Sequence, residues 1–310
     1  MKKVLIADYV RSPFTPAHKG ALGKVRPDEL AAQVIRALLA KTAADPETVE
    51  DLILGCAFPE AEQGLNVARL IGFLADLPVS VTGVTVNRFC GSSMQAVHMA
   101  AGAIQMNAGE AFICAGVESM SRVPVMGFNP LPHPGLYRRY PQAYMSMGQT
   151  AENVARQYQV TRHEQEVFAL TSQQKAAAAE HDGRFAEELV PIDCDGTHIE
   201  RDGCIRADTT LEALASLKPA FDANGTVTAG TSSPLTDGAA AILVCTEKWA
   251  ANHGREPLAQ VKSIAAAGCP PELMGLGPVA ATRKALARAK LSLADIDLVE
   301  LNEAFASQSI

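Results

Sequence analysis

A cysteine followed by small polar residues is the feature of this sequence best suited to chemistry. Cys90 follows the β-branched run Val81–Val86 and precedes Gly91 and the segment Ser92–Met106, whose small residues predict a helix. A thiol at a strand-to-helix turn lies among unpaired backbone N–H groups and at the positive end of the helix dipole, which favour the thiolate. The narrow turn leaves room for a thioester carbonyl, so the pattern predicts covalent acyl transfer. From the residues alone, the alternative is a buried cysteine that packs like alanine.

The elements around Cys90 predict an α/β fold. Short apolar runs indicate strands and amphipathic or small-residue segments indicate helices, and their alternation predicts a sheet with helices on its faces. The expected strands are Val4–Ala7, Leu52–Leu54, Val81–Val86, Ala111–Ala115 and Ala239–Cys245, and the expected helices are Pro27–Lys41, Asn66–Leu74 and Ser92–Met106.

The middle of the chain reads as an excursion from this domain. Pro124–Pro141 is rich in proline and predicts a loop, Thr150–Glu180 predicts a helix, and Asp182–Asp222 is polar and irregular. The last part repeats the first in outline, with a strand-like Leu258–Ile264, a helix and a strand-like Asp297–Leu301. The repeat predicts a second domain that is incomplete at residue 310.

Composition narrows the partners and the compartment. The net charge is −7, no long basic run occurs, and no apolar run is long enough to span a membrane, so we expect neither a nucleic-acid partner nor a membrane span. The seven cysteines are widely spaced without a Cys-x-x-Cys pair, which argues against a disulfide framework and a structural zinc site. We therefore expect a reducing, cytoplasmic location.

Five motifs, in order along nearly the whole chain, resemble those of the thiolase family. They are the nucleophile segment Val86–Ala96, the strand end Gly116–Ser121, the loop-domain entry Met147–Ala155, the coenzyme A-side loop Thr228–Ala241 and the Asn-Glu-Ala-Phe motif Asn302–Ala306. The resemblance implies a thiolase-like α/β fold with duplicated five-stranded mixed sheets, covered by helices, and an inserted loop domain. The implied domains are 1–120 plus 237–256, a loop domain with coenzyme A contacts at 121–236, and the start of a C-terminal domain at 257–310.

The resemblance also implies an activity. Cys90 would take the acyl group of a 3-ketoacyl-CoA and pass it to coenzyme A, giving acetyl-CoA and a shortened acyl-CoA. Asn302 would orient a water in an oxyanion hole; from the residues alone it could equally be a turn or cap residue. Acyl-CoA substrates, coenzyme A as co-substrate, no permanent cofactor, no metal and a homodimer or homotetramer are implied as well.

Further positions match those that contact coenzyme A. Arg206 corresponds to a residue near the nucleotide end, although without the resemblance it reads as a solvated surface charge. The residues that match the lining of the pantetheine tunnel are Ser233, Ala229, Leu235, Ala220, Phe221, Met147, Ala304 and Phe305.

The sequence departs from the family pattern at two places. No Gly-His-Pro motif and no second cysteine in a glycine-rich loop occur before Ile310, so we expect a truncated chain with negligible activity. Ser146 stands where acetoacetyl-specific members often carry histidine, which favours the degradative, fatty-acid β-oxidation type. The alternatives are an acetyl-CoA C-acetyltransferase, an inactive coenzyme A-binding or scaffold subunit, and a stand-alone cysteine hydrolase.

Overall fold

The chain folds into two units that are each assembled from three separate stretches of sequence. The computed structural model describes residues 2–310. The first unit comprises the residues up to Pro130, Phe185–Cys204 and Leu235–Lys262, and the second comprises Leu131–Arg184, Ile205–Pro234 and Ser263–Ile310.

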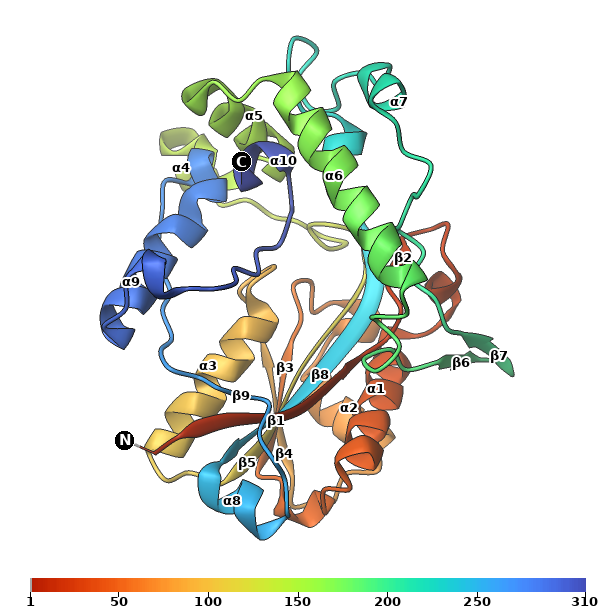
Figure 1. Cartoon of the computed structure of the whole chain (residues 1–310), viewed down its shortest axis with the longest axis vertical. Coiled ribbons are helices and arrows are strands. Elements are labelled where there is room, and N and C mark those ends of the chain that lie inside the picture. Colours follow the sequence, from red (N-terminus) through yellow and green to blue (C-terminus); the bar gives the residue numbers. More distant parts are fainter. Residues whose placement is uncertain (1) are drawn as a thin grey trace. The chain divides into compact units, whose positions relative to one another are not determined.

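A seven-stranded mixed sheet forms the centre of the first unit (Figure 1). The strand order is β4-β3-β5-β8-β1-β9, and β2 also pairs with β8. Strands β4, β3 and β5 are parallel, whereas β8 is antiparallel to β5 and to β1. The strands are β1 (Val4–Arg11), β2 (Thr15–Pro16), β3 (Asp51–Gly55), β4 (Thr82–Val86), β5 (Ala111–Ser119), β8 (Thr236–Thr246) and β9 (Ala259–Gln260).

Helices α1 (Pro27–Thr42) and α2 (Val67–Leu74) cover one face of this sheet, and α3 (Ser92–Gln105) covers the other (Figure 1). The pleat of β3 explains the division, because Leu52 and Leu54 belong to the core shared with α1 and α2, while Ile53 is buried outside that cluster. The sheet is therefore apolar on both faces, as the buried run of β3 predicts.

Shorter elements complete the first unit. Helix α8 (Glu247–Asn252) follows β8, and β6 (Ile192–Cys194) pairs with β7 (Thr197–Ile199) in a separate hairpin. The 3-10 helices are Ala21–Lys24, Pro46–Thr48 and Ala61–Gln63.

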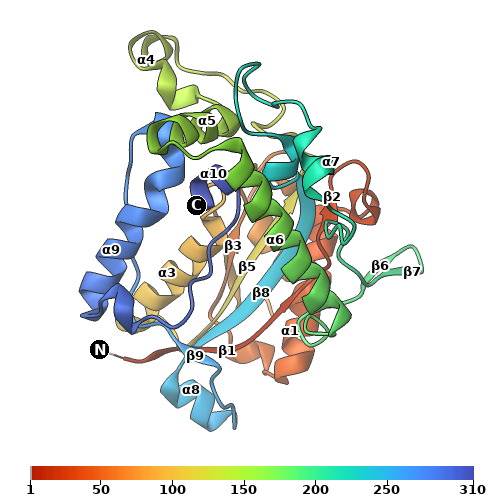
Figure 2. The same ribbon diagram turned by 45° about the horizontal axis from the view of Figure 1, so that its top comes forward.

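The second unit is helical. Helices α5 and α6 lie beside the short α10, as Figure 2 shows. Its helices are α4 (Pro134–Arg139), α5 (Met147–Tyr158), α6 (Arg162–His181), α7 (Leu211–Ala215), α9 (Gly277–Ala289) and α10 (Ala306–Ser309). Its 3-10 helices are Pro141–Tyr144, Ala229–Thr231, Pro271–Leu276 and Leu293–Asp295.

The single helix expected at Thr150–Glu180 is two helices. Gln159 adopts a left-handed conformation with φ of 56° and ends α5. Thr161 then caps α6 in a capping box with Glu164. The break places Arg162 at the first position of α6, which matters for the contacts described below.

The strand expected at Asp297–Leu301 does not form, so that prediction is wrong. Leu298 and Val299 are 84% and 65% exposed, and no strand in the described part of the chain pairs with them. An apolar run becomes a strand only when a neighbour satisfies its backbone groups. Only Ala259–Gln260 of the strand expected at Leu258–Ile264 pairs, with β1. The predicted division into three domains stays a prediction. None of the helices formed by residues 2–310 is both long and apolar enough to cross a bilayer.

Candidate active site

Cys90 differs from the other cysteines in its exposure. Of the seven, all within the described residues, only Cys90 is exposed. Cys56, Cys114 and Cys245 are buried. Burial, with a smaller contribution from the charge of Glu118, raises the pKa of Cys56 to about 12, and burial raises the pKa of Cys245 to about 11. Those two thiols stay protonated at neutral pH. Because Cys90 is exposed, the alternative of a buried, alanine-like cysteine does not apply to it.

The backbone of the nucleophile turn, Asn87–Gly91, is tightly constrained. Phe89, directly before the cysteine, has φ of 45°, a left-handed conformation that a non-glycine residue adopts at a cost. The buried hydroxyl of Ser92 accepts a hydrogen bond from the N–H of Arg88 at 2.9 Å and donates one to the carbonyl of Phe89 at 2.5 Å. These bonds hold the turn in the strained conformation that presents Cys90.

Asn87 fastens this turn to the loop after β3. Its side-chain carbonyl accepts a hydrogen bond from the N–H of Phe89 at 2.9 Å, and its amide nitrogen donates to the carbonyl of Ala57 at 3.0 Å. The ring of Phe89 also lies 5.9 Å from that of Phe58 in the same loop. The turn is thus tied to a neighbouring strand end.

Two glycines let the start of α3 approach the sheet closely. Gly55, the last residue of β3, is paired with Gly116 within β5. A Cβ atom on Gly55 would lie 2.5 Å from the backbone nitrogen of Ser93, and one on Gly116 would overlap the Ser93 hydroxyl. Glycine is required at Gly55 because the backbone of the helix N-terminus occupies the space of a side chain, whereas at Gly116 the obstacle is the side chain of Ser93.

A partly buried carboxylate supports the loop that holds the turn. Glu118 accepts hydrogen bonds from the N–H of Ala57 and from the side chain of Gln63, both at 2.7 Å. Gln63 is fully buried and also donates to the carbonyl of Phe58 at 2.9 Å. Burial raises the pKa of Glu118, and these hydrogen bonds oppose the rise.

In the second unit, Asn302 and Ser233 line one pocket. The pocket has a volume of about 220 Å³ and is formed by α6, the segment 230–234 and the residues around Asn302. Its walls include Ser172, Gln173 and Glu303, and the hydroxyl of Ser172 donates to Glu303 at 2.6 Å. Most of the residues that line this pocket are polar.

Most of the predicted coenzyme A contacts in this unit lie together. Phe305 and Ala304 share an apolar cluster with Met147, and the ring of Phe305 meets that of Phe221 edge-on at 5.9 Å. The N–H of Ser233 donates to the carbonyl of Ala304 at 2.9 Å.

The remaining predicted coenzyme A contacts lie outside the apolar cluster of Phe305. Ala220 and Ala229 are exposed in the same unit, and Ala220 donates its N–H to Val227 at 2.9 Å. Arg206 is exposed, and its N–H donates to Gln173 at 2.7 Å, beside the pocket. Leu235 and Cys90 belong to the first unit, and Leu235 is 46% exposed.

The sequence interpretation missed the polar residues of α6. Residues 162, 166, 169 and 173 recur at the spacing of one helix face, which a hydrophobic pattern does not reveal because the face is polar or small. To predict Ser172, Gln173 and Glu303 as pocket residues, one would have had to know that Ser172 pairs with Glu303, which is 131 positions away in the sequence. The residues that the structure describes hold no group of three metal-ligating side chains.

Comparisons with known proteins place the fold and the motifs in one family. Residues 4–248 match the profile of the thiolase N-terminal domain, and residues 255–310 match that of the thiolase C-terminal domain. The 3-ketoacyl-CoA thiolase of Bacillus subtilis (strain 168) is 46% identical over 323 residues, covering 100% of this chain and 83% of the relative. That of Shewanella frigidimarina (strain NCIMB 400) is 48% identical over 317 residues, covering 100% and 82%.

Two solved structures are similar as well. A Bacillus anthracis acetyl-CoA acetyltransferase has a TM-score of 0.90 at 38% identity, covering 100% of this chain and 82% of its own. The human mitochondrial 3-ketoacyl-CoA thiolase has a TM-score of 0.90 at 34% identity, covering 99% and 82%. The α/β fold with a cysteine at a strand-to-helix turn is thus that of an acyl-transferring enzyme class. The chain belongs to the thiolase family. The predicted family and fold class are confirmed.

Proposed function

We propose that the protein is an acetyl-CoA C-acyltransferase of the degradative type, a 3-ketoacyl-CoA thiolase with Cys90 as its nucleophile. Two 3-ketoacyl-CoA thiolases that are 46% and 48% identical over the whole chain support the activity. The observation that carries the residue assignment is that the one exposed cysteine among the described residues lies on a strained turn at the start of α3.

The reaction follows from this nucleophile. The sulfur of Cys90 forms a bond to the C3 carbonyl carbon of a 3-ketoacyl-CoA, and the bond between C2 and C3 breaks. Its electron pair stays on C2, which gains a proton in exchange for the proton that the thiol loses, and acetyl-CoA leaves. The thiol of coenzyme A then attacks the acyl-enzyme, which releases a shortened acyl-CoA and returns the proton to Cys90.

The second unit supplies most of the coenzyme A contacts in this proposal. Phe221, Met147, Ala304 and Phe305 offer an apolar surface for pantetheine, and Arg206 offers a cation for the nucleotide end. The remaining proposed contacts are Ser233, Ala229 and Ala220 of the second unit and Leu235 of the first unit. Asn302, at the polar pocket, would orient a water toward the thioester oxygen, a type of contribution worth roughly 3–4 kcal/mol.

Trapping the acyl-enzyme tests the proposal. Incubation with acetyl-CoA should add the mass of one acetyl group to the wild-type protein, at Cys90 after peptide mapping. Cys90→Ala should remain unmodified, while the control Cys194→Ala in the β6–β7 hairpin should be acetylated like wild type. If iodoacetamide labels Cys90 but acetyl-CoA leaves it unmodified, the proposal is wrong. Hydrolysis of acyl-CoA that does not depend on added coenzyme A would instead support a hydrolase.

An acetyl-CoA C-acetyltransferase is the second candidate, because the Bacillus anthracis acetyl-CoA acetyltransferase is as similar in structure as the human thiolase. Ser146 bears on this choice. It caps α5 in a capping box with Gln149, so the position is occupied by a structural hydroxyl. Comparing kcat/KM for acetoacetyl-CoA with that for longer 3-ketoacyl-CoA substrates distinguishes the two candidates. A strong preference for acetoacetyl-CoA would favour the acetyltransferase.

We also propose a homodimer or homotetramer in the cytoplasm. Strand β4 is an edge strand of the sheet in the described structure, and an unpaired edge favours association with another chain. The nearby exposed apolar side chains Phe73, Phe89 and Met94 support the same surface. Light scattering after size-exclusion chromatography measures the subunit number, and a monomer at all concentrations would contradict this part of the proposal.

A further inference from the structure

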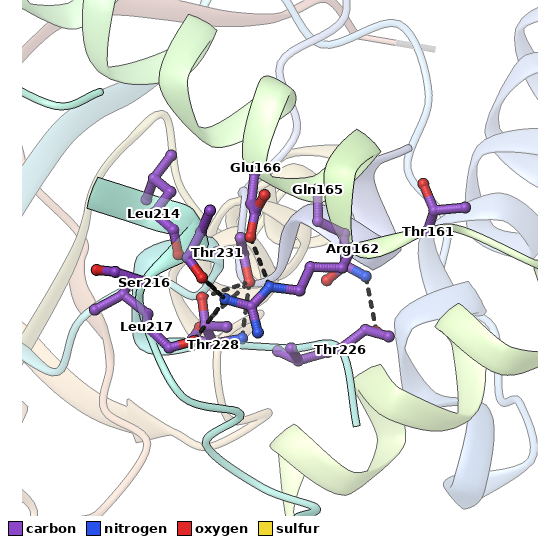
Figure 3. A network of polar contacts seen from close by, with 12 residues as sticks. Thr161, Arg162, Gln165, Glu166, Leu214, Ser216, Leu217, Thr226, Thr228 and Thr231 are labelled. Carbon is purple, nitrogen blue, oxygen red and sulfur yellow. Dashed lines mark hydrogen bonds and ion pairs between the residues drawn. The ribbon is translucent and has the colours of Figure 1, made fainter. Parts of the chain in front are cut away.

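Arg162, at the start of α6, holds the C-terminal end of another helix. Its Nη2 atom donates hydrogen bonds to the carbonyls of Leu214 at 3.2 Å, Ala215 at 3.1 Å and Leu217 at 2.6 Å (Figure 3). Leu214 and Ala215 are the last residues of α7, whose final carbonyls have no partner within the helix. One guanidinium therefore caps α7 and the chain that leaves it.

Glu166 fixes the orientation of this guanidinium. It lies one turn further along α6, is 5% exposed, and accepts a hydrogen bond from Nε of Arg162 at 2.6 Å. A planar guanidinium with one edge on a buried carboxylate points its other nitrogens in a set direction. A lysine ammonium, as a point charge, cannot serve the carboxylate and the three carbonyls with the same geometry.

The other end of the segment Leu217–Val227 is fastened by two more side chains. The amide of Gln165 donates to the hydroxyl of Thr226 at 3.0 Å. The carboxylate of Glu152, only 1% exposed, accepts from the N–H groups of Thr226 at 3.0 Å and Val227 at 2.9 Å. Side chains of α5 and α6 thus form hydrogen bonds with both ends of the segment.

The middle of the segment is exposed and carries proposed coenzyme A contacts. Ala220 and Phe221 are exposed, and Phe221 is held mainly by its edge-on contact with Phe305. The ion pair between Arg156 and Asp222, at 3.0 Å, is on the surface and contributes little to the position of the segment. Backbone hydrogen bonds from Ala220 to Val227 and from Gly225 to Asp222 hold the middle of the segment, and the side chains of α5 and α6 fix where its two ends lie.

We propose that Arg162 is a positioning residue, which holds the segment Leu217–Val227 in the conformation that receives coenzyme A. The inference rests on the proposed function, because it takes Ala220 and Phe221 as contacts of the substrate. Without Arg162, the carbonyls of Ala215 and Leu217 and the buried Glu166 lose their partner, while the carbonyl of Leu214 keeps the N–H of Leu217, and the start of the segment samples other conformations. Affinity for coenzyme A then falls in proportion to the population that stays competent.

Calorimetric titration with coenzyme A gives the first test. Arg162→Ala should weaken binding about tenfold, the loss expected when roughly one molecule in ten keeps the competent segment. Arg162→Lys, which keeps a cation beside Glu166, should fall between the alanine variant and wild type. The control is Arg184→Ala, which removes an arginine that is 73% exposed and lies just after the end of α6. This variant should bind coenzyme A like wild type.

A second measurement separates positioning from general damage to the fold. Acetylation of Cys90 is compared with two donors, acetyl-CoA and S-acetyl-N-acetylcysteamine, which lacks the nucleotide and most of the pantetheine. Arg162→Ala should slow acetylation by acetyl-CoA and leave the rate with the short donor unchanged. Equal slowing with both donors, or wild-type affinity for coenzyme A, would overturn the inference.

Measurements on the wild-type protein distinguish failure of the proposed function from failure of the inference about Arg162. If neither donor acetylates it and coenzyme A does not bind, the proposed function fails, whatever the variants do. If Arg162→Ala does not fold, the lysine variant decides, because unchanged coenzyme A affinity in Arg162→Lys contradicts a requirement for the guanidinium geometry.

Discussion

The nucleophile turn Asn87–Gly91 and the segment Leu217–Val227 are held in place by opposite means. The turn is fixed by backbone geometry, a serine from the adjoining helix and two glycines that admit the helix N-terminus. The segment is fixed at its ends by long charged side chains from two helices. The first device leaves almost no freedom at the thiol of Cys90, and the second leaves an exposed middle that carries the proposed coenzyme A contacts.

Gly55→Ala should give the largest effect, because a Cβ there meets the backbone of Ser93, which cannot swing aside. We expect a loss of about 3 kcal/mol in the free energy of unfolding, measured in urea. The matched control is Gly102→Ala in the middle of the same α3 helix, where a Cβ meets nothing within 4 Å. That change should raise stability by about 0.5–1 kcal/mol. Equal effects of the two substitutions would mean that close approach at β3 is unimportant.

Ser92→Ala tests the hydrogen bonds of the turn. The substitution leaves the N–H of Arg88 without its partner, whereas the carbonyl of Phe89 keeps the hydrogen bond from the backbone N–H of residue 92 at 3.0 Å, and the cost should be about 2 kcal/mol. We also expect a changed rate of Cys90 alkylation by iodoacetamide, since the turn that presents the thiol relaxes. Ser93→Ala, at the exposed neighbouring position, should alter neither quantity by a comparable amount. A turn unaffected by Ser92→Ala would have to be held by Asn87 alone.

Gly148→Ala is the corresponding test of the second region. A Cβ at this position overlaps the ring of Phe221, but the ring is 40% exposed and can move. The loss of stability should therefore be only about 1 kcal/mol, with a several-fold loss of coenzyme A affinity as the main effect. In the double variant Gly148→Ala/Phe221→Ala the stability loss should be less than additive, because the overlap is gone. Additive losses would show that the overlap does not cause the destabilisation.

Glu62→Gln should have the smallest effect and a defined dependence on pH. Glu62 precedes Gln63, pairs with Arg122 and with Arg26, and its pKa is lowered, chiefly by the hydrogen bond from Arg122. A lowered carboxyl pKa contributes stability above the unfolded value, near the ordinary 4.5, and that stability is lost as pH falls through the lower folded value. The variant should be less stable than wild type at pH 7 by no more than about 1 kcal/mol, because these side chains are partly exposed.

The measurement is the difference in denaturation midpoint between the two proteins from pH 7 to pH 3. The difference should be constant at neutral pH and shrink in acid. A difference that grows as the pH falls would contradict the assignment of the lowered pKa to the ion pairs.

The comparison also explains what could be predicted from the sequence. The Cys90 turn was readable because the strand, the cysteine, Gly91 and the small-residue helix are contiguous. The support of this turn by Gln63 and Glu118 could not be predicted, because the two residues are 55 positions apart and the sequence around neither of them indicates the contact. The α/β alternation was predictable from apolar runs, and strands β3, β4 and β5 form where expected.

The failures have the same origin. Asp297–Leu301 has the local character of β3, but pairing is a property of neighbours, and the segment is exposed. Arg162 and Glu166 were not predicted to make these contacts, because spacing along one helix says nothing about the carbonyls that approach from Leu214–Leu217. Local motifs were predictable, whereas contacts between distant segments were not.

Strand β4 forms the sheet edge and runs directly into Asn87 and the turn that carries Cys90. If the proposed self-association uses this edge, pairing restricts the conformations open to Cys90. Thermodynamic reciprocity then requires that loading the thiol with an acyl group changes the affinity between subunits by the same factor that pairing changes the equilibrium for loading. Self-association of the protein and acylation of Cys90 should then depend on each other, so that each is measured as a function of the other.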